Sequence, residues 1–181
     1  MKKLIVLRDL FLLFLIFAVL GWMYEVLLTM WAYGYFENRG FLFGPWLPIY
    51  GSGGLALYGV FGRLAGASSH RLRNVVLVFA GICALATVIE LGASYLLDIA
   101  GVGFRSLWFY DGEPFNFDGR VSLAASLRFG VIGTAALYGA VPLWKKLCAV
   151  KKQTALNTVS TVLAVLFAID LIFRIPFGSN L

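Results

Sequence analysis

Residues 10–32 read LFLLFLIFAVLGWMYEVLLTMWA, and this stretch decides the fold class. It carries a single charged side chain, Glu25, and is long enough to cross about 30 Å of hydrocarbon as a helix. Basic residues precede it, as in a secretory signal, but the apolar run continues past Trp22 without a small-residue cleavage pattern. We interpret it as a retained signal anchor.

The composition of the whole chain points to a lipid bilayer. Of 181 residues, 61% are hydrophobic, 16% aromatic and only 13% charged, and the mean hydropathy is +0.87. Soluble domains have roughly a quarter of their residues charged. A soluble globule, a disordered chain and a soluble nucleic-acid binder are therefore excluded, despite the net charge of +6. Cys83 and Cys148 are too few and too far apart for a disulfide framework or a metal cluster, so a packing role is expected.

The sequence predicts an all-α polytopic membrane protein that forms one transmembrane domain over residues 1–181. The second predicted span opens with Pro48 and several glycines, so we expect an irregular or re-entrant segment at 36–54. The five predicted spans are residues 10–32, 47–63, 75–97, 121–144 and 155–175.

The basic residues predict the orientation, because Lys and Arg in short loops stay on the cytoplasmic side. Every lysine falls at the N-terminus or in the loop after the fourth span, and three arginines fall at residues 63–73. The N-terminus is therefore expected inside and the C-terminus outside. This basic rim suits anionic lipid headgroups and needs no nucleic acid to explain it. The predicted location is the cell membrane, as a multi-pass protein of the bacterial inner membrane type.

Two short stretches suggest an internal repeat. Residues 53–59 read GGLALYG and residues 133–139 read GTAALYG, and each follows a span that carries a glutamate, Glu25 or Glu90. Tandem parallel hairpins with a fifth helix are one interpretation, since repeats are common in transporters. Chance recurrence of Leu, Ala and Gly is the other.

Five ionisable side chains fall within predicted spans, all in the outer half: Glu25, Glu90, Arg128, Asp170 and Arg174. Burying such groups in lipid is costly, so they are candidates for function. Asp170 and Arg174 are four residues apart on one helix face and predict an internal ion pair. For Glu25, Glu90 and Arg128, a structural pairing between helices and a ligand or proton site both remain open.

Two outer loops combine aromatic residues, glycines and arginines. They are FENRGFLFGPWLPIYGSGG at 36–54 and LWFYDGEPFNFDGR at 107–120, and both are expected to fold back over the helix ends as a lid. From these loops and the spans we predict a polar binding site of Glu25, Arg39, Glu90, Arg120 and Arg128, open to the extracytoplasmic side. The predicted structural or gating positions are Asn38, Gly40, Gly44, Pro45, Pro48, Tyr50, Gly51 and Asp118.

The motifs also carry a family resemblance. The GWxxE of residues 21–25, the NRGFLxGPxxPIYG of residues 38–51, Glu90 and the WxYD...FNxxGR of residues 108–120 resemble the bacterial membrane family called "Putative ABC-transporter type IV", or CmpB-like. The resemblance covers nearly the whole chain. It implies an integral membrane transport protein similar to an ABC-transporter permease component.

An ABC system also needs an ATPase, and the chain has no Gly-x4-Gly-Lys-Ser/Thr phosphate loop. The resemblance therefore implies a separate ATPase subunit, for which the inner loops 63–74 and 145–154 are the expected docking surface. No cofactor is expected, and a homo-oligomer is compatible with the sequence.

Three other functions remain open. Glu25 and Glu90 would serve as acid and base in an intramembrane enzyme acting on a lipid or lipid-linked substrate. No catalytic motif supports it, because the lone His70 lies in a basic inner loop and the Asp-Gly-Arg of residues 118–120 lacks the rest of a lipid phosphotransferase motif. A substrate-binding subunit that needs partners and an assembly scaffold are the other two.

Overall fold

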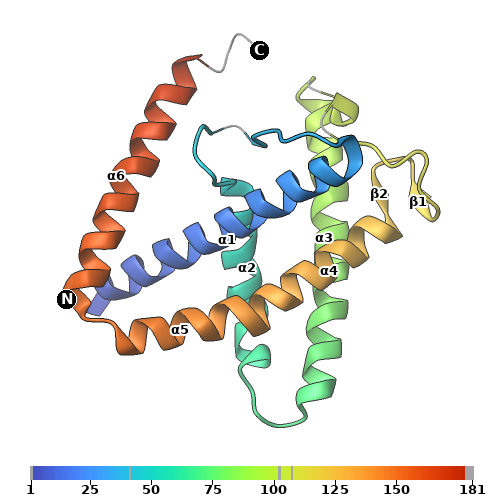
Figure 1. The fold of residues 1–181 in the computed structure, drawn as a ribbon. Helices are drawn as coiled ribbons and strands as arrows, with labels where there is room; N and C mark the ends of the chain where they lie inside the picture. The colour runs from blue at the N-terminus through green and yellow to red at the C-terminus, as the bar shows by residue number, and fades with distance from the viewer. Residues whose placement is uncertain (1, 41, 102, 107, 178–181) are drawn as a thin grey trace. The chain divides into compact units, whose positions relative to one another are not determined.

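The computed structural model describes residues 2–40, 42–101, 103–106 and 108–177. Most of these residues are helical (Figure 1). Phe41 and Leu107, which belong to the predicted lid loops, lie outside the described residues. The helices are α1 (Lys2–Tyr33), α2 (Pro48–Ala65), α3 (Arg71–Ile99), α4 (Leu123–Ala135), α5 (Val141–Val150) and α6 (Gln153–Phe177).

Four helical stretches are long and apolar enough to cross a membrane: Lys3–Tyr33, Arg71–Ile99, Leu123–Val150 and Gln153–Arg174. They contain most of four of the predicted spans. The predicted second span corresponds to α2, which is not among the four. Its glycines, Ser52 and Arg63 lower its mean hydropathy. The five-span count, the orientation and the tandem hairpins stay predictions.

The predicted irregular segment at 36–54 is wrong for its last third. The described residues between Gly34 and Leu47 are non-helical, but α2 begins at Pro48 and runs without a break through Ser52 and Gly54. Proline is well accommodated in the first turn of a helix, where its missing N–H has no intrahelical acceptor in any case. The predicted gating residues Pro48, Tyr50 and Gly51 therefore lie in a regular helix.

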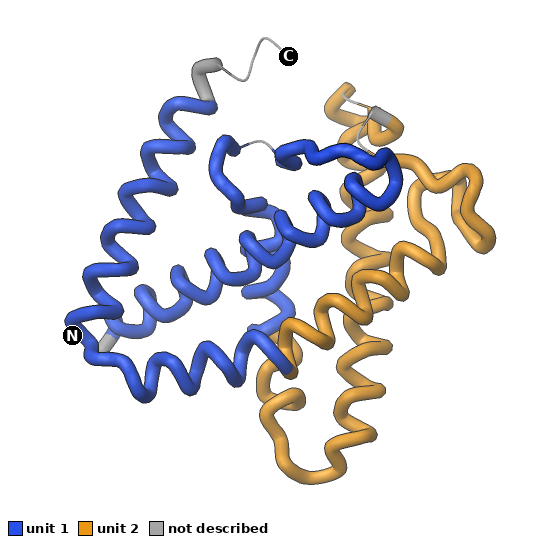
Figure 2. The backbone as a smooth tube through the Cα atoms, in the orientation of Figure 1, with its two compact units in different colours: residues 1–59, 139–181 blue, residues 60–138 orange. Residues whose placement is uncertain are grey.

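The chain forms two compact units, residues 1–59 with 139–181 (unit 1) and residues 60–138 (unit 2), coloured separately in Figure 2. The prediction of one transmembrane domain stays a prediction.

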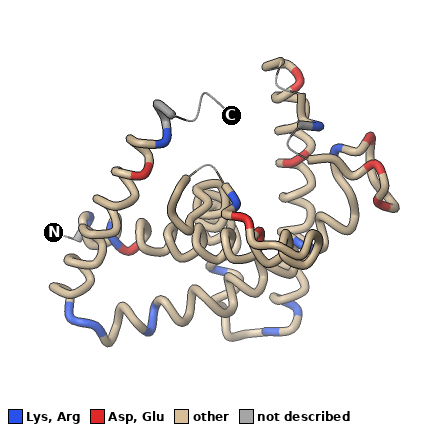
Figure 3. Tube along the Cα trace, turned by 45° about the horizontal axis from the view of Figure 1, so that its top comes forward, with Lys and Arg blue, Asp and Glu red and all other residues tan. Residues whose placement is uncertain are grey.

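Figure 3 colours the charged residues along the chain. The acidic residues of the 98–118 region and the basic residues of the α5–α6 junction can be followed there.

In unit 1, small residues let α2 approach α1 closely. A Cβ added at Gly51 would overlap the ring of Phe14, and one at Gly54 would overlap the ring of Phe17. The ring of Phe167 of α6 meets Phe14 edge to face, with ring centres 5.7 Å apart. In lipid, where apolar burial gives little driving force between helices, such close packing holds a bundle together.

At its N-terminal end α1 is tied to α6 by a buried polar cluster. The Arg8 guanidinium donates to Gln153 at 2.8 Å and Asn157 at 2.7 Å and pairs with Asp9 at 2.6 Å. Arg8 is 8% exposed. Arg8 precedes the first predicted span in the sequence, and in the structure its charge is paired with Asp9 and its guanidinium bonds to α6.

In unit 2, α3 packs against α4 in the same way. Cys83 and the ring of Phe79 occupy the space that a Cβ of Gly130 would need, which fits the packing role expected for Cys83. The hydroxyls of Thr87 and Ser126 lie 2.6 Å apart across the pair. A hydroxyl pair of this kind satisfies two polar groups that lipid cannot.

A small antiparallel β-hairpin precedes α4 and corrects the start of the fourth predicted span. Its strands are β1 (Asn116–Phe117) and β2 (Val121–Ser122), so residues 121–122 are not helical. Ser122 caps α4, because its hydroxyl accepts the N–H of Ala125 at 3.0 Å. The helix continues beyond the predicted end through a π-helical turn at residues 136–140 into α5, where Pro142 lacks an N–H for the ladder.

Candidate functional site

Glu90 is the central carboxylate of unit 2. Its Oε1 accepts a hydrogen bond from the Tyr110 hydroxyl at 2.9 Å, and its Oε2 is buried with no hydrogen-bond partner among the described residues. Arg128 and Glu113 lie near enough to act on Glu90 electrostatically. Burial, together with the neighbouring Glu90 carboxylate, raises the pKa of Tyr110 well above its usual range. Tyr110 therefore stays a neutral hydrogen-bond donor at any physiological pH.

Glu113 joins the second outer segment to α4. It accepts the Ser122 hydroxyl and forms an ion pair with Arg128, whose Nη2 lies 2.8 Å from its Oε1. Both side chains of the ion pair are partly exposed, at 42% and 30%. Arg128 thus has a carboxylate partner, but solvent or a ligand still reaches its guanidinium.

Arg120 is held on several sides. Its guanidinium pairs with Asp98 at 2.7 Å and Asp118 at 3.0 Å, and its centre lies 4.3 Å from the ring centres of both Tyr95 and Phe104. Its side chain is 12% exposed. Burial by itself would lower the pKa of Arg120, but the two carboxylates outweigh it and raise the pKa above the ordinary value. These contacts hold the segment after β1 against the C-terminal end of α3, where Asp98 lies.

We expect Arg120→Gln to loosen the segment 104–122, because the variant loses two ion pairs and two cation–π contacts together. Hydrogen exchange of the segment in detergent should speed up at least severalfold. Arg105→Gln is the matched control, since the Arg105–Asp111 pair is about half exposed and such pairs contribute little. Equal exchange in both variants would show that Arg120 does not clamp the segment.

Glu25 is the corresponding carboxylate of unit 1. The Tyr50 hydroxyl at the start of α2 donates to its Oε1, and the Tyr50 ring packs over Gly21 one turn earlier on α1. Arg39 lies farther along the first outer segment, where it pairs with Glu37 at 3.3 Å in an exposed setting. The structure thus places Glu25 against a neutral donor and Arg39 against an acid of its own segment.

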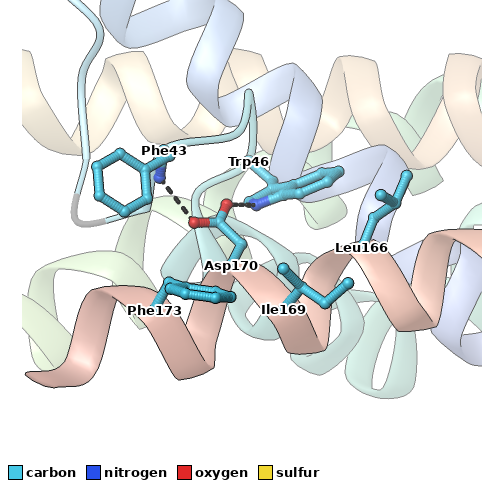
Figure 4. Close-up of a pocket in the computed structure, with 6 residues that line it drawn as sticks. All are labelled: Phe43, Trp46, Leu166, Ile169, Asp170 and Phe173. Carbon is cyan, nitrogen blue, oxygen red and sulfur yellow. Dashed lines mark hydrogen bonds between the residues drawn. The ribbon is translucent and has the colours of Figure 1, made fainter.

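Asp170 of α6 holds the first outer segment. Its Oδ1 accepts the N–H of Phe43 at 2.9 Å, and its Oδ2 accepts the N–H of Gly44 and the indole N–H of Trp46, both at 2.8 Å. Figure 4 shows the carboxylate between Phe43 and Trp46. An apolar pocket of about 510 Å³ adjoins it, lined by Phe43, Trp46, Leu166, Ile169, Asp170 and Phe173.

Further contacts fix the same segment. Asn38 accepts the indole N–H of Trp22 at 2.6 Å and donates to the Phe43 carbonyl at 3.0 Å. Gly40 has φ +107° and lies against Leu47, so a side chain there would be strained and would clash. The Arg174 guanidinium lies 4.9 Å from the centre of the Phe43 ring. The Asp170–Arg174 ion pair stays a prediction.

The predicted binding residues divide between the units. Glu25 and Arg39 belong to unit 1, whereas Glu90, Arg120 and Arg128 belong to unit 2. Unit 2 brings Arg128 close to Glu90, while Arg120 is engaged with Asp98 and Asp118, of which Asp118 has φ +51° in the turn after β1.

Sequence reasoning missed the partners Tyr110, Asp98 and Glu113. Tyr110 and Glu113 lie in the second aromatic loop and Asp98 lies near the end of α3, but the fold of the loop decides which charged groups meet. Within the described residues, no three His, Cys, Asp or Glu side chains are grouped so that they could hold a metal ion. The polar groups instead offer carboxylates with neutral phenol donors, and one partly exposed arginine in Arg128.

Comparison with known proteins gives one family. The model of the family described as "Putative ABC-transporter type IV" matches residues 12–175. No curated protein and no solved structure matches the chain.

Proposed function

The chain belongs to the Putative ABC-transporter type IV family, and from this premise we propose that it is the permease-like membrane component of a transport system, with polar groups open to the extracytoplasmic side. The family and the four helices that are long and apolar enough to cross a membrane together fit a membrane transport protein. The permease role, the five spans with the N-terminus inside, and the location in a bacterial inner membrane are parts of the proposal.

One observation carries it: in each unit, intramembrane charges contact the long segment between two helices or the first turn of the helix that follows it. In unit 1, Glu25 contacts the start of α2 and Asp170 contacts residues 43–46. In unit 2, Glu90 and Arg128 contact the 110–113 region. Charged side chains are costly in lipid, so their recurrence beside these segments supports polar sites at that end of each unit.

We expect Glu25→Gln, Glu90→Gln and Arg128→Gln each to weaken binding of the transported solute by at least about tenfold, because a lost charged hydrogen bond costs about 1.5–3 kcal/mol. The solute is identified by mass spectrometry of the protein purified from native membranes in mild detergent. Its uptake into proteoliposomes is then compared among the variants. Glu37→Gln is the control, because Glu37 forms an exposed ion pair with Arg39 in the first outer segment. Unchanged uptake in all three variants would refute the site.

The proposal includes a separate ATPase that docks on the basic inner loops 63–74 and 145–154, beside anionic lipid headgroups. Self-association of the chain is compatible with it. In that native purification, an ATPase in stoichiometric amount would support the ABC assignment, and a complex with no ATPase would favour a stand-alone carrier.

The proposed orientation makes a separate prediction. In a variant without Cys83 and Cys148, a cysteine at Lys151 should react with a membrane-impermeant maleimide only after permeabilisation, because basic loops stay inside. A cysteine at Phe115, which is 83% exposed in the second outer segment, should react on intact cells. The reverse pattern would overturn the orientation.

A further inference from the structure

The first helices of the two predicted hairpins have matching sequences. Glu25 and Glu90 lie 65 positions apart, and the same spacing relates five further identical pairs in α1 and α3. Phe14 and Phe79 are one of these pairs, and the buried Thr29 matches the buried Ser94. The other identical pairs are Leu7 with Leu72, Arg8 with Arg73, Leu12 with Leu77 and Leu20 with Leu85.

The packing of the second helices matches as well. Phe14 meets Gly51 of α2, and its counterpart Phe79 meets Gly130 of α4, which lies 79 positions after Gly51. Gly54 and Gly133, also 79 apart, are both buried. Equivalent aromatic residues therefore pack against equivalent glycines in two hairpins that the structure describes independently.

One extra residue separates the two copies, and the structure accommodates it. Tyr58 and Tyr138 of the LYG sequences are 80 positions apart, one more than the glycines before them. Ala56 and Ala136 are already 80 positions apart, so the spacing changes just before residue 136, where the π-helical turn at residues 136–140 begins. A π-turn is wider than an α-turn by one residue, so it absorbs an insertion without breaking the helix.

The glutamates are the acidic groups that the two copies share. Each accepts a phenol hydrogen bond, Glu25 from Tyr50 and Glu90 from Tyr110. The charged groups that face Glu90 are Arg128 and Glu113, which pair with each other. Among the described residues, no ion pair to Glu25 or Glu90 is present. A carboxylate inside a membrane that forms no ion pair is most readily neutralised by a proton. No metal-binding group of acids is found among the described residues.

We propose that residues 7–59 and 72–139 are two copies of one helical hairpin, and that Glu25 and Glu90 are the equivalent carboxyls of a duplicated proton-binding site. The proton leaves water on the side of the two outer segments, adds to the carboxylate oxygen and is released there again, while the phenol orients the carboxyl. This inference deepens the proposed function, because it names the ligand of two of its binding groups.

Infrared difference spectra of the full chain in lipid, recorded across a pH titration, test the proton sites. Glu25→Gln and Glu90→Gln should each remove about half of the band of titrating buried carboxylic acid, and the double variant should remove nearly all of it. Glu37→Gln should leave the band unchanged. Tyr110→Phe should move the midpoint of the Glu90 component only, which a merely structural glutamate would not show. A band that no single variant changes, or that one variant abolishes, overturns the paired sites.

Uptake separates this inference from the proposed function. If Glu25→Gln and Glu90→Gln each remove their part of the titrating band but leave uptake unchanged, the proton sites are supported and the proposed transport role is refuted. Lost uptake without any titrating band would refute the proton sites alone.

A pair of deletions tests the duplication. Deleting Ala136 should convert the π-turn to an α-turn and leave a folded protein, because the side chains of the helix beyond it keep their directions. Deleting Ala56, near the matched place in α2, should rotate the rest of that helix by about 100° and unfold the hairpin. Tolerance of the second deletion but not the first would overturn the inference.

Discussion

Asp170→Ala should release the first outer segment from α6. The carboxylate accepts three hydrogen bonds from residues 43–46, and each of these donors is bonded to Asp170 itself. Leaving partly buried N–H groups without an acceptor costs about 1–3 kcal/mol each, so we expect a local loss of about 2–4 kcal/mol after some water enters. Trypsin cleavage after Arg39, followed by mass spectrometry in detergent, should then accelerate at least about tenfold.

Two variants make this result specific to the carboxylate. Glu37→Ala removes an acid of the same segment that is about half exposed, and it should leave the cleavage rate nearly unchanged. Asp170→Asn keeps one acceptor oxygen and should give an intermediate rate. An unchanged rate in Asp170→Ala would mean that Trp22 and Asn38 hold the segment without α6.

The second large effect is expected at Gly51. A Cβ at this position would overlap the Phe14 ring and lie 2.9 Å from the Phe14 carbonyl oxygen, which belongs to the backbone and cannot turn aside. Gly51→Ala should therefore push α2 away from α1 and cost about 1–3 kcal/mol. In a chain of this size, that lowers the melting temperature by about 3–10 °C.

Gly53 provides the control within the same helix. A Cβ added there meets nothing within 4 Å, so Gly53→Ala should leave the melting temperature unchanged or raise it slightly. Gly51→Leu should be more damaging than Gly51→Ala, because a branched side chain cannot fit beside Phe14. Equal melting temperatures for Gly51→Ala and Gly53→Ala would show that α1 and α2 do not pack closely.

The sequence predicted the helices well where one continuous stretch of the chain is long and apolar. The predicted spans 10–32, 75–97 and 155–175 all lie within α1, α3 and α6. The entrance of α2 and the start of α4 were misjudged, both at short stretches of Gly, Pro or Ser. There, local composition allows helix, turn and strand, and the neighbouring chain decides among them.

The sequence predicted which residues belong to the candidate site, but not which residues they pair with. The sequence singled out Glu25, Glu90, Arg128, Asp170 and Arg174 as unusual charges for a membrane, and Arg120 as a loop residue of the predicted site. It could not predict that Arg120 would be clamped by Asp98 and Asp118, or that Asp170 would bind a segment 124 to 127 residues away. Such partners depend on how distant segments pack, and sequence spacing carries no trace of that.

The sequence by itself determined that this chain is a helical membrane protein with a few costly charges, because lipid demands that each spanning segment satisfy its own backbone. It also determined the family, through motifs that cover nearly all of the chain. Only the tertiary structure decided which charges are consumed inside the protein and which keep a neutral phenol as partner. The reason is that a charge in lipid must be neutralised by whatever group the fold brings to it, and that group is distant in sequence.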